Sequence, residues 1–208
     1  MNPIRLQPGD ALIVVDMQND FVNGSLAVPG GAGIVPALNR HVAAFRGRSL
    51  PVVATRDGHS PDHCSFRDCG GPWPSHCVGG TEGAQFVPGL ALPSDAIVVS
   101  KATQADQEAY SGFAGTDLDS QLRTRGIRRL FGGGLATDYP VGASLAFASF
   151  AFSRWAVFSM PTMNRLCLPR ATSSIASRAE KSNETALPLT ADSVTVISTH
   201  IPSSVAPT

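Results

Sequence analysis

The sequence has no excess of charge of either sign. Sixteen Lys and Arg residues balance sixteen Asp and Glu residues among 208, so the formal net charge is zero. Nucleic-acid backbones and anionic lipid attract proteins that present a positive field, which this chain lacks. Its apolar runs, such as 11–15 and 146–152, are far shorter than the roughly 20 residues that cross a bilayer. We therefore expect no nucleic-acid partner and no membrane partner.

Cysteine is also scarce. Cysteines stand only at positions 64, 69, 77 and 167, too few and too clustered for a disulfide framework in a chain that can build its own core, so we expect reduced thiols. The amino terminus has neither a basic region followed by an apolar core nor a small-residue cleavage site, which predicts a cytoplasmic protein. The length fits one domain over 1–208, with a frayed tail at 201–208.

Short apolar runs alternate with segments of helical periodicity. The run Ala11–Asp16 is typical of a parallel strand buried on both faces, and residues 34–45 have the spacing of a helix. This alternation predicts an α/β fold with a doubly wound, mostly parallel sheet of about six strands and helices on both faces. The other expected strands are 50–55, 96–100, 129–132, 156–159 and 194–198, and the other expected helices are 117–125, 141–152 and one within 173–187.

In a doubly wound sheet, ligands bind beyond the carboxyl ends of the strands. Asp16, residues 55–57, Lys101 and residues 134–140 all follow or end predicted strands, so we expect them at one edge. Residues 56–93 lack periodicity and are rich in Gly, Pro, His and Cys. A connection this long inside a compact domain is usually functional or disordered.

That region carries candidate metal ligands. Asp57, His59, His63 and His76 offer one carboxylate and three imidazoles, which suit zinc, iron or manganese. Spacing alone also fits histidines on a polar surface loop. A closed structural zinc site using the thiols at 64, 69 and 77 is a second alternative, although their gaps do not form a Cys-x-x-Cys pair.

Asp16 and Lys101 are a second candidate pair. Taken singly, Asp16 could be a turn cap and Lys101 a solvated charge. Converging on one crevice, the acid could accept a proton from a nucleophile and the cation could favour the resulting anion. The residues alone identify no nucleophile.

Several segments resemble, in order, the nicotinamidases (pyrazinamidases) of the isochorismatase-like cysteine hydrolase superfamily. The resemblance covers about residues 10–150, and its motifs are long and distinct from one another. They are 15–21 (VDMQNDF), 55–59 (TRDGH), His63 with Ser65 and Phe66, 71–77 (GPWPSHC), Lys101, and 134–139 (GLATDY).

The resemblance implies a role for each matching residue. Asp16 would be the general base with Lys101 as its partner, and Ala136, after the family's cis peptide at Leu135–Ala136, would offer its N–H to the oxyanion. One divalent metal, zinc or alternatively iron or manganese, would bind nicotinamide or a similar aromatic amide, and the protein would be a monomer or small homo-oligomer. Asp57, His59 and His76 would hold the metal, and Phe21, Trp73, Leu135 and Tyr139 would line the substrate pocket.

The sequence departs from the family at the nucleophile. Pro140 stands where the family has the cysteine that attacks the amide, and proline supplies neither a thiol nor an N–H. Gly58 also replaces a usual aromatic, and 160–182 lacks the family's acidic strand end. Cys77 adjoins a proposed ligand, but we expect its side chain to point away from the site.

Three functions remain open at this stage. The first is nicotinamide deamidation in NAD salvage, with weak or absent activity because of Pro140. The second is a non-catalytic, metal-dependent binder of pyridine carboxamides. The third is a metal-water amidase that needs no covalent intermediate.

Overall fold

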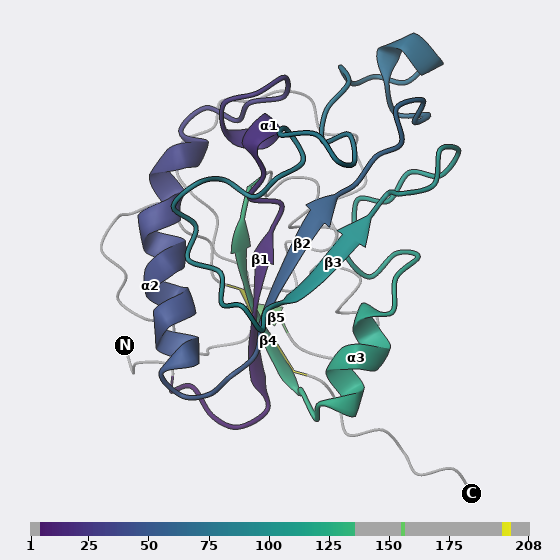
Figure 1. Cartoon of the computed structure of the whole chain (residues 1–208). Helices are drawn as coiled ribbons and strands as arrows, with labels where there is room; N and C mark the ends of the chain where they lie inside the picture. Colours follow the sequence, from purple (N-terminus) through teal and green to yellow (C-terminus); the bar gives the residue numbers. More distant parts are fainter. Residues whose placement is uncertain (1–4, 136–154, 157–196, 201–208) are drawn as a thin grey trace, which may run out of the picture.

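The computed structural model describes residues 5–135, 155–156 and 197–200 (Figure 1). Six strands form one sheet in the order β3-β2-β1-β4-β6-β5. The pairs β1–β2, β1–β4 and β2–β3 are parallel, and β4–β6 and β5–β6 are antiparallel. The strands are β1 (Asp10–Val15), β2 (Val52–Asp57), β3 (Ile97–Lys101), β4 (Arg129–Gly134), β5 (Trp155–Ala156) and β6 (Ile197–His200).

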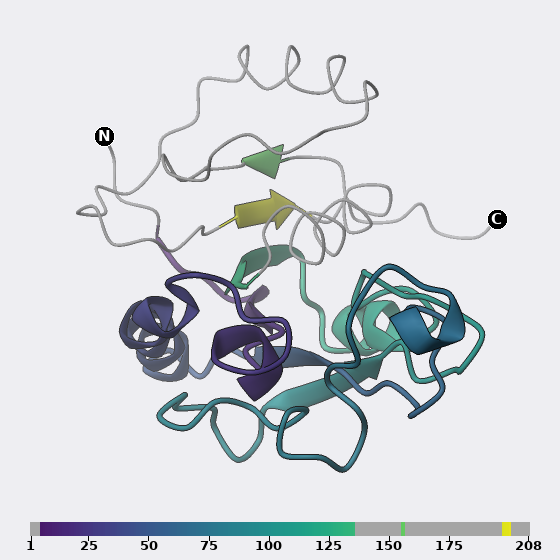
Figure 2. The same ribbon diagram turned by 90° about the horizontal axis from the view of Figure 1, so that it is seen from above.

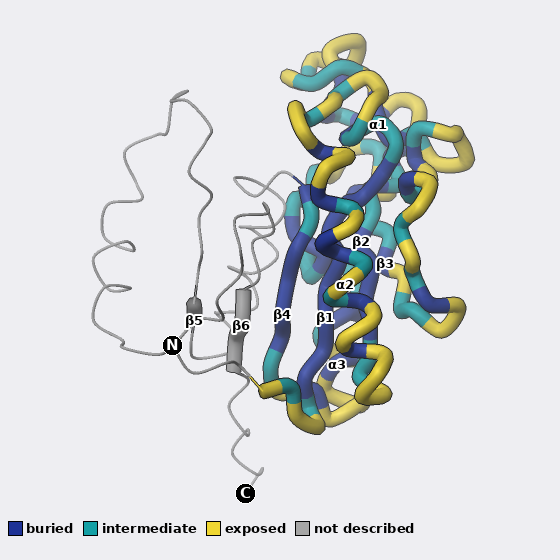
Figure 3. The backbone as a smooth tube through the Cα atoms, turned by 90° about the vertical axis from the view of Figure 1, so that its left-hand side faces the viewer, coloured by how far each residue is buried: buried dark blue, intermediate teal, exposed yellow. Residues whose placement is uncertain are grey.

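Helices cover both faces of the sheet, as the sequence predicted. The helices α2 and α3 lie on opposite sides of the sheet (Figure 2). Alternate residues of β1 face opposite sides, so Leu12 and Val14 pack in the cluster that contains α2, whereas Ile13 packs with α3. Figure 3 shows β1 and β2 as a largely buried centre. The helical elements are α1 (Asn19–Val22), η1 (Gly31–Ile34), α2 (Val35–Arg46), η2 (Arg67–Cys69) and α3 (Leu118–Thr124).

Local sequence explains the helix boundaries. Pro36 lies in the first turn of α2, where its missing N–H has no intrahelical partner to lose. After α3, Gly126 adopts a φ of +66°, a left-handed conformation that glycine takes without steric cost. The predicted helices 141–152 and 173–187 lie outside the described residues. Within the described part, no helix is long and apolar enough to span a membrane.

Candidate active site and metal centre

Three charged side chains meet where β1, β2 and β3 end. Asp57 pairs in register with Lys101, and Asp16 follows Val15, which pairs with Thr55. The Lys101 Nζ lies 3.0 Å from Asp16 Oδ2 and 2.5 Å from Asp57 Oδ1. All three side chains are buried. The structure therefore gathers the predicted acid, the predicted lysine and a predicted metal ligand into one contact group.

The two carboxylate oxygens of Asp16 have different partners, Thr55 and Lys101. The Thr55 hydroxyl donates to Asp16 Oδ1 at 2.8 Å. Among the described residues none donates a hydrogen bond to Asp16 Oδ2, which has only the ion-pair contact with Lys101. Burial raises the pKa of Asp16, although the charge of Lys101 opposes the shift. A buried carboxylate with a raised pKa can accept a proton from a neighbouring nucleophile.

Lys101 stays charged between these two acids. Burial alone would lower the pKa of Lys101, but the negative charges of Asp16 and Asp57 outweigh burial and raise it. The ammonium is therefore a permanent cation that balances two buried carboxylates.

Asp57, His59 and His76 form a group that could hold one metal ion. Their ligand atoms lie within 4.8 Å of one another, and all three residues are buried. The Nδ1 of His59 contacts the Ala102 carbonyl at 3.1 Å, and the Nδ1 of His76 contacts the Pro74 carbonyl at 2.8 Å. Such contacts fix a tautomer in which Nδ1 donates and Nε2 is a free ligand atom.

His59 is held in the neutral form that binds metal. Burial, followed by the neighbouring His76 and His63, lowers the pKa of His59 to about 3. Its imidazole is therefore uncharged near neutral pH and keeps the Nε2 lone pair available. A donor set of one carboxylate and two neutral imidazoles fits a divalent ion such as zinc.

The depressed pKa of His59 predicts acid sensitivity of the metal-free chain. Unfolded His59 takes up a proton near pH 6.5, whereas folded His59 stays neutral down to about pH 3, so the unfolded state binds more protons in this window. The free energy of unfolding should fall with decreasing pH by up to about 1.4 kcal/mol per unit from this residue. Urea denaturation in chelator should show a steeper loss for the parent than for His59→Gln, and equal slopes would contradict this expectation.

His63 is buried beside the metal group but does not belong to it. Its Nδ1 lies 2.7 Å from Ser65 Oγ and its Nε2 lies 3.2 Å from the Gln107 carbonyl. With both nitrogens occupied, the ring packs against His59 at a centroid distance of 4.2 Å. His63 therefore supports the ligand ring.

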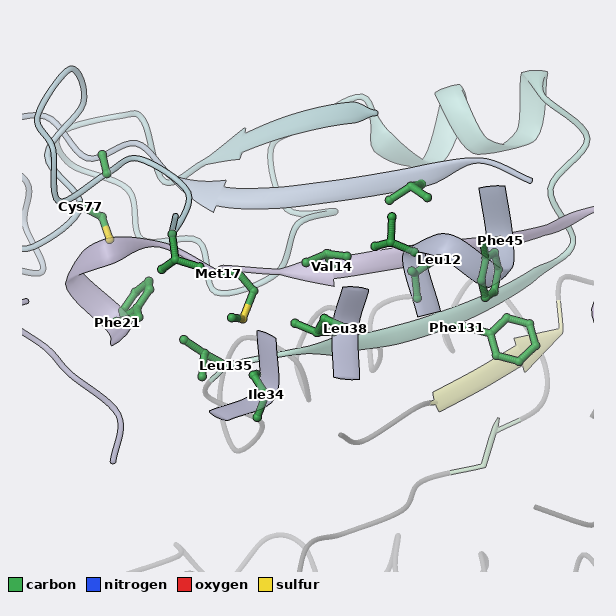
Figure 4. Close-up of a cluster of buried hydrophobic side chains, with 14 residues drawn as sticks. Leu12, Val14, Met17, Phe21, Ile34, Leu38, Phe45, Cys77, Phe131 and Leu135 are labelled. Carbon is green, nitrogen blue, oxygen red and sulfur yellow. The ribbon is translucent and has the colours of Figure 1, made fainter. Parts of the chain in front are cut away.

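The cysteines do not form a thiolate metal site in the part of the chain that the structure describes, where the three-residue metal group contains none of them. Cys77 is buried in the hydrophobic cluster next to Met17 and Phe21 (Figure 4). Burial, followed by the charges of Asp57 and Asp20, raises the pKa of the Cys77 thiol, which stays protonated. Cys77 is therefore a poor replacement nucleophile.

The predicted pocket residues are only partly described. The Phe21 ring is buried with its centroid 5.5 Å from that of His76. The Trp73 Nε1 lies 3.4 Å from the Tyr110 hydroxyl. Leu135 donates its N–H to Val15 at 3.1 Å, and its side chain packs in the cluster beside Phe21 and Ile34 (Figure 4). The described residues end at Leu135 in this region. The predicted cis peptide at Leu135–Ala136 and the predicted site residues Ala136, Tyr139 and Pro140 therefore lie outside them.

Sequence reasoning did not single out Gln18. Its side-chain Nε2 donates to the Asp57 carbonyl at 2.8 Å and to the Ala84 carbonyl at 3.0 Å, and its Oε1 accepts from the Asp57 N–H at 2.8 Å. Gln18 thereby fixes the backbone of a predicted metal ligand. The polar residues Asp16, Gln18 and Asp20 at alternate positions directly after β1 were the sequence feature that could have drawn attention to Gln18.

Three of the four described non-glycine residues with positive φ lie in or beside this site, and the fourth, Ser49, lies before the start of β2. Asp16, Cys77 and Ala102 have φ values of 51°, 46° and 50°, in the left-handed region that residues other than glycine rarely adopt. Asp16 belongs to the charged group with Lys101 and Asp57. Cys77 follows the possible metal ligand His76, and Ala102 follows Lys101. Such conformations persist where the surrounding structure enforces them, and they are concentrated at functional sites.

The described part of the chain thus combines a mostly parallel α/β sheet with an acid, a lysine and a possible metal group at its strand ends. The isochorismatase domain model matches residues 10–154. A nicotinamidase/pyrazinamidase of Mycobacterium tuberculosis is 43% identical over 140 residues, which cover 63% of this chain and 74% of the relative. The chain belongs to the isochorismatase family, and its relatives place it with the nicotinamidases.

Solved structures agree with this placement. The pyrazinamidase of Pyrococcus horikoshii in complex with zinc is 51% identical, with a TM-score of 0.66 over 69% of this chain and 79% of that chain. PnC1 from L. infantum in complex with nicotinate is 38% identical, with a TM-score of 0.65 over 69% of this chain and 75% of that chain.

Proposed function

We propose that the chain is a nicotinamidase-type amidohydrolase whose own turnover is weak or absent. Its substrate would be nicotinamide or a similar aromatic amide, converted to the acid and ammonia in cytoplasmic NAD salvage. The convergence of Asp16, Lys101 and the Asp57–His59–His76 group at one edge of the sheet carries this proposal. The names of the relatives supply the substrate class.

In this proposal a divalent metal is held by Asp57, His59 and His76. Zinc is favoured because a solved relative is a zinc complex, with iron and manganese as alternatives. When bound, the metal would supply open coordination positions for water and for the ring nitrogen of the substrate.

The remaining roles fall to the chain's own residues. Asp16 would act as the general base, which takes a proton from the attacking group and passes it to the amide nitrogen. Lys101 balances the negative charges of Asp16 and Asp57. Phe21, Trp73, Leu135 and Tyr139 line the substrate pocket, and the Ala136 N–H stabilises the developing oxyanion. Pro140 occupies the nucleophile position without a thiol, which is why turnover is expected to be low. The protein would act as a monomer or small homo-oligomer.

A second candidate function is metal-dependent binding of pyridine carboxamides without turnover. It is favoured because Pro140 offers no thiol at the nucleophile position, and because the Cys77 thiol, next to the proposed ligand His76, is buried and protonated. The retention of Asp16 and Lys101 as a complete buried pair favours the amidohydrolase assignment, because a simple binder has no use for a proton acceptor there.

The chain as written is expected to release nicotinate and ammonia from nicotinamide at the background rate. Zinc-loaded protein would be assayed with and without chelator, with Asp57→Asn as the matched control for the metal site. Hydrolysis that disappears on chelation and in Asp57→Asn would contradict this expectation and support a metal-water amidase. Hydrolysis indifferent to both would contradict the proposed metal dependence.

A further inference from the structure

We infer that Asp20 is a positioning residue that holds His76 in the metal group by fixing the backbone of Cys77. The inference rests on the proposed metal-dependent function. Asp20 Oδ2 accepts the Cys77 N–H at 2.7 Å, across 57 positions of the chain. Cys77 directly follows His76 and has a φ of 46°. The Asp20 carboxylate therefore binds the backbone N–H next to His76, the residue that lies with Asp57 and His59 in the possible metal group.

The carboxylate of Asp20 is closely enclosed. A Cβ atom on Gly24 or on Gly83 would overlap the Asp20 side chain. Asp20 also donates its own N–H to the Gly83 carbonyl at 3.0 Å and accepts the Leu26 N–H at 3.1 Å. Its backbone is therefore anchored on both sides, and the two glycines leave room for a side chain that reaches the Cys77 N–H.

Cys77 links the two histidine ligands. Its N–H is held by Asp20, and its carbonyl accepts the His59 N–H at 3.1 Å. The His76 ring packs against Phe21, His59 and Phe66, but its side-chain hydrogen bond is to the Pro74 carbonyl, only two residues away, so it does not tie the backbone at 76–77 to a distant element. If Asp20 releases Cys77, a buried N–H loses its acceptor and the left-handed turn can relax. The Nε2 of His76 would then leave the group.

The same short segment also holds the carboxylate ligand. Gln18, two residues before Asp20, makes hydrogen bonds to both the N–H and the carbonyl of Asp57. Asp16 thus forms an ion pair with Lys101, and Gln18 hydrogen-bonds to the backbone of Asp57. Asp20 hydrogen-bonds to the backbone of Cys77, the neighbour of His76. Of these three residues, Asp20 is the one that we infer positions a histidine ligand, His76.

Zinc affinity, measured by competition with a chromophoric chelator, tests the inference without requiring turnover. Asp20→Ala should weaken zinc binding by about 10- to 100-fold, the usual effect of removing a residue that orients a ligand. Asp20→Asn keeps an oxygen acceptor for the Cys77 N–H and should retain affinity close to that of the parent. Asp10→Ala is the matched control, because it removes a buried carboxylate that pairs with Arg129 at the opposite end of the sheet.

Cobalt absorption reports which ligand is lost. With Co²⁺ in place of zinc, the visible spectrum of Asp20→Ala should resemble that of His76→Ala, whereas Asp20→Asn and Asp10→Ala should resemble the parent. Parental zinc affinity in Asp20→Ala, or an equal loss in Asp10→Ala, would overturn the inference. If Asp20→Ala does not fold, weak zinc binding by folded Asp20→Asn would overturn it instead. A parent that binds no zinc would overturn the proposed function and this inference together.

Discussion

Replacing Pro140 by cysteine is expected to raise nicotinamide hydrolysis from background by about 10³-fold or more, since losing a nucleophile commonly removes that much turnover. The change supplies two groups at once, a thiol to attack the amide carbonyl and an N–H for the oxyanion. Asp16 would take the thiol proton and deliver it to the amide nitrogen, which leaves as ammonia. Water would then hydrolyse the thioester to nicotinate and restore the thiol.

Two control variants make this result specific. Pro140→Ser restores the N–H but offers a weaker nucleophile, so it should recover little of the activity. Pro140→Cys combined with Asp16→Asn keeps the thiol but loses the proton acceptor, and it should fall back toward background. A folded, zinc-loaded Pro140→Cys protein that releases no ammonia above the parent level would refute the assignment to nicotinamide deamidation.

Replacing Lys101 by methionine is expected to destabilise the chain by about 3–5 kcal/mol, the usual cost of removing one partner from a buried ion pair. Asp16 and Asp57 would be left as two neighbouring buried carboxylates without their cation. Burial and mutual repulsion then favour the protonated form, so the pKa of Asp16 should rise further.

The effect of Lys101→Met should depend on pH in a defined direction. A carboxyl whose folded pKa lies above its unfolded pKa contributes stability at low pH that is lost as pH rises through the folded value. The stability deficit of the variant should therefore be largest near neutral pH and shrink in acid, as measured by urea denaturation. Arg123→Met is the control, because the Arg123–Asp119 pair is solvent-exposed and should cost at most about 1 kcal/mol. A deficit that does not change with pH would contradict the buried-pair interpretation.

The architecture could be predicted because its signals are local. Alternating apolar runs and helical periodicity indicated β1, β3, β4, α2 and α3 to within two residues, with β2 displaced by two residues from the predicted 50–55. The last two strands lie at 155–156 and 197–200 rather than at the predicted 156–159 and 194–198, and the short helical elements α1, η1 and η2 were not predicted. Parallel strands align their carboxyl ends, so Asp16, Asp57 and Lys101 were expected at one edge before any side-chain contact was known. The antiparallel pairing of β6 with β4 did not follow from those patterns.

Spacing alone could not predict which histidines belong to the possible metal group and which one only packs beside it. His63 and His76 both follow Asp57 and His59 in the same irregular region, and only their contacts distinguish them. Both nitrogens of His63 are occupied, whereas His76 keeps one free. The roles of Gln18 and Asp20 were hidden for the same reason, because only long-range contacts reveal them. Asp57 lies 39 positions after Gln18, at the end of β2, and Cys77 lies 57 positions after Asp20, in a segment without periodicity.

The most direct test of the assigned site is calorimetric titration of nicotinamide into the zinc-loaded chain as written. We expect saturable binding that is lost when chelator removes the metal, and that is also lost in His76→Ala, because the metal would hold the ring nitrogen. No binding by a folded, zinc-loaded chain, or equal binding with and without metal, would contradict the assignment of this site to a nicotinamidase.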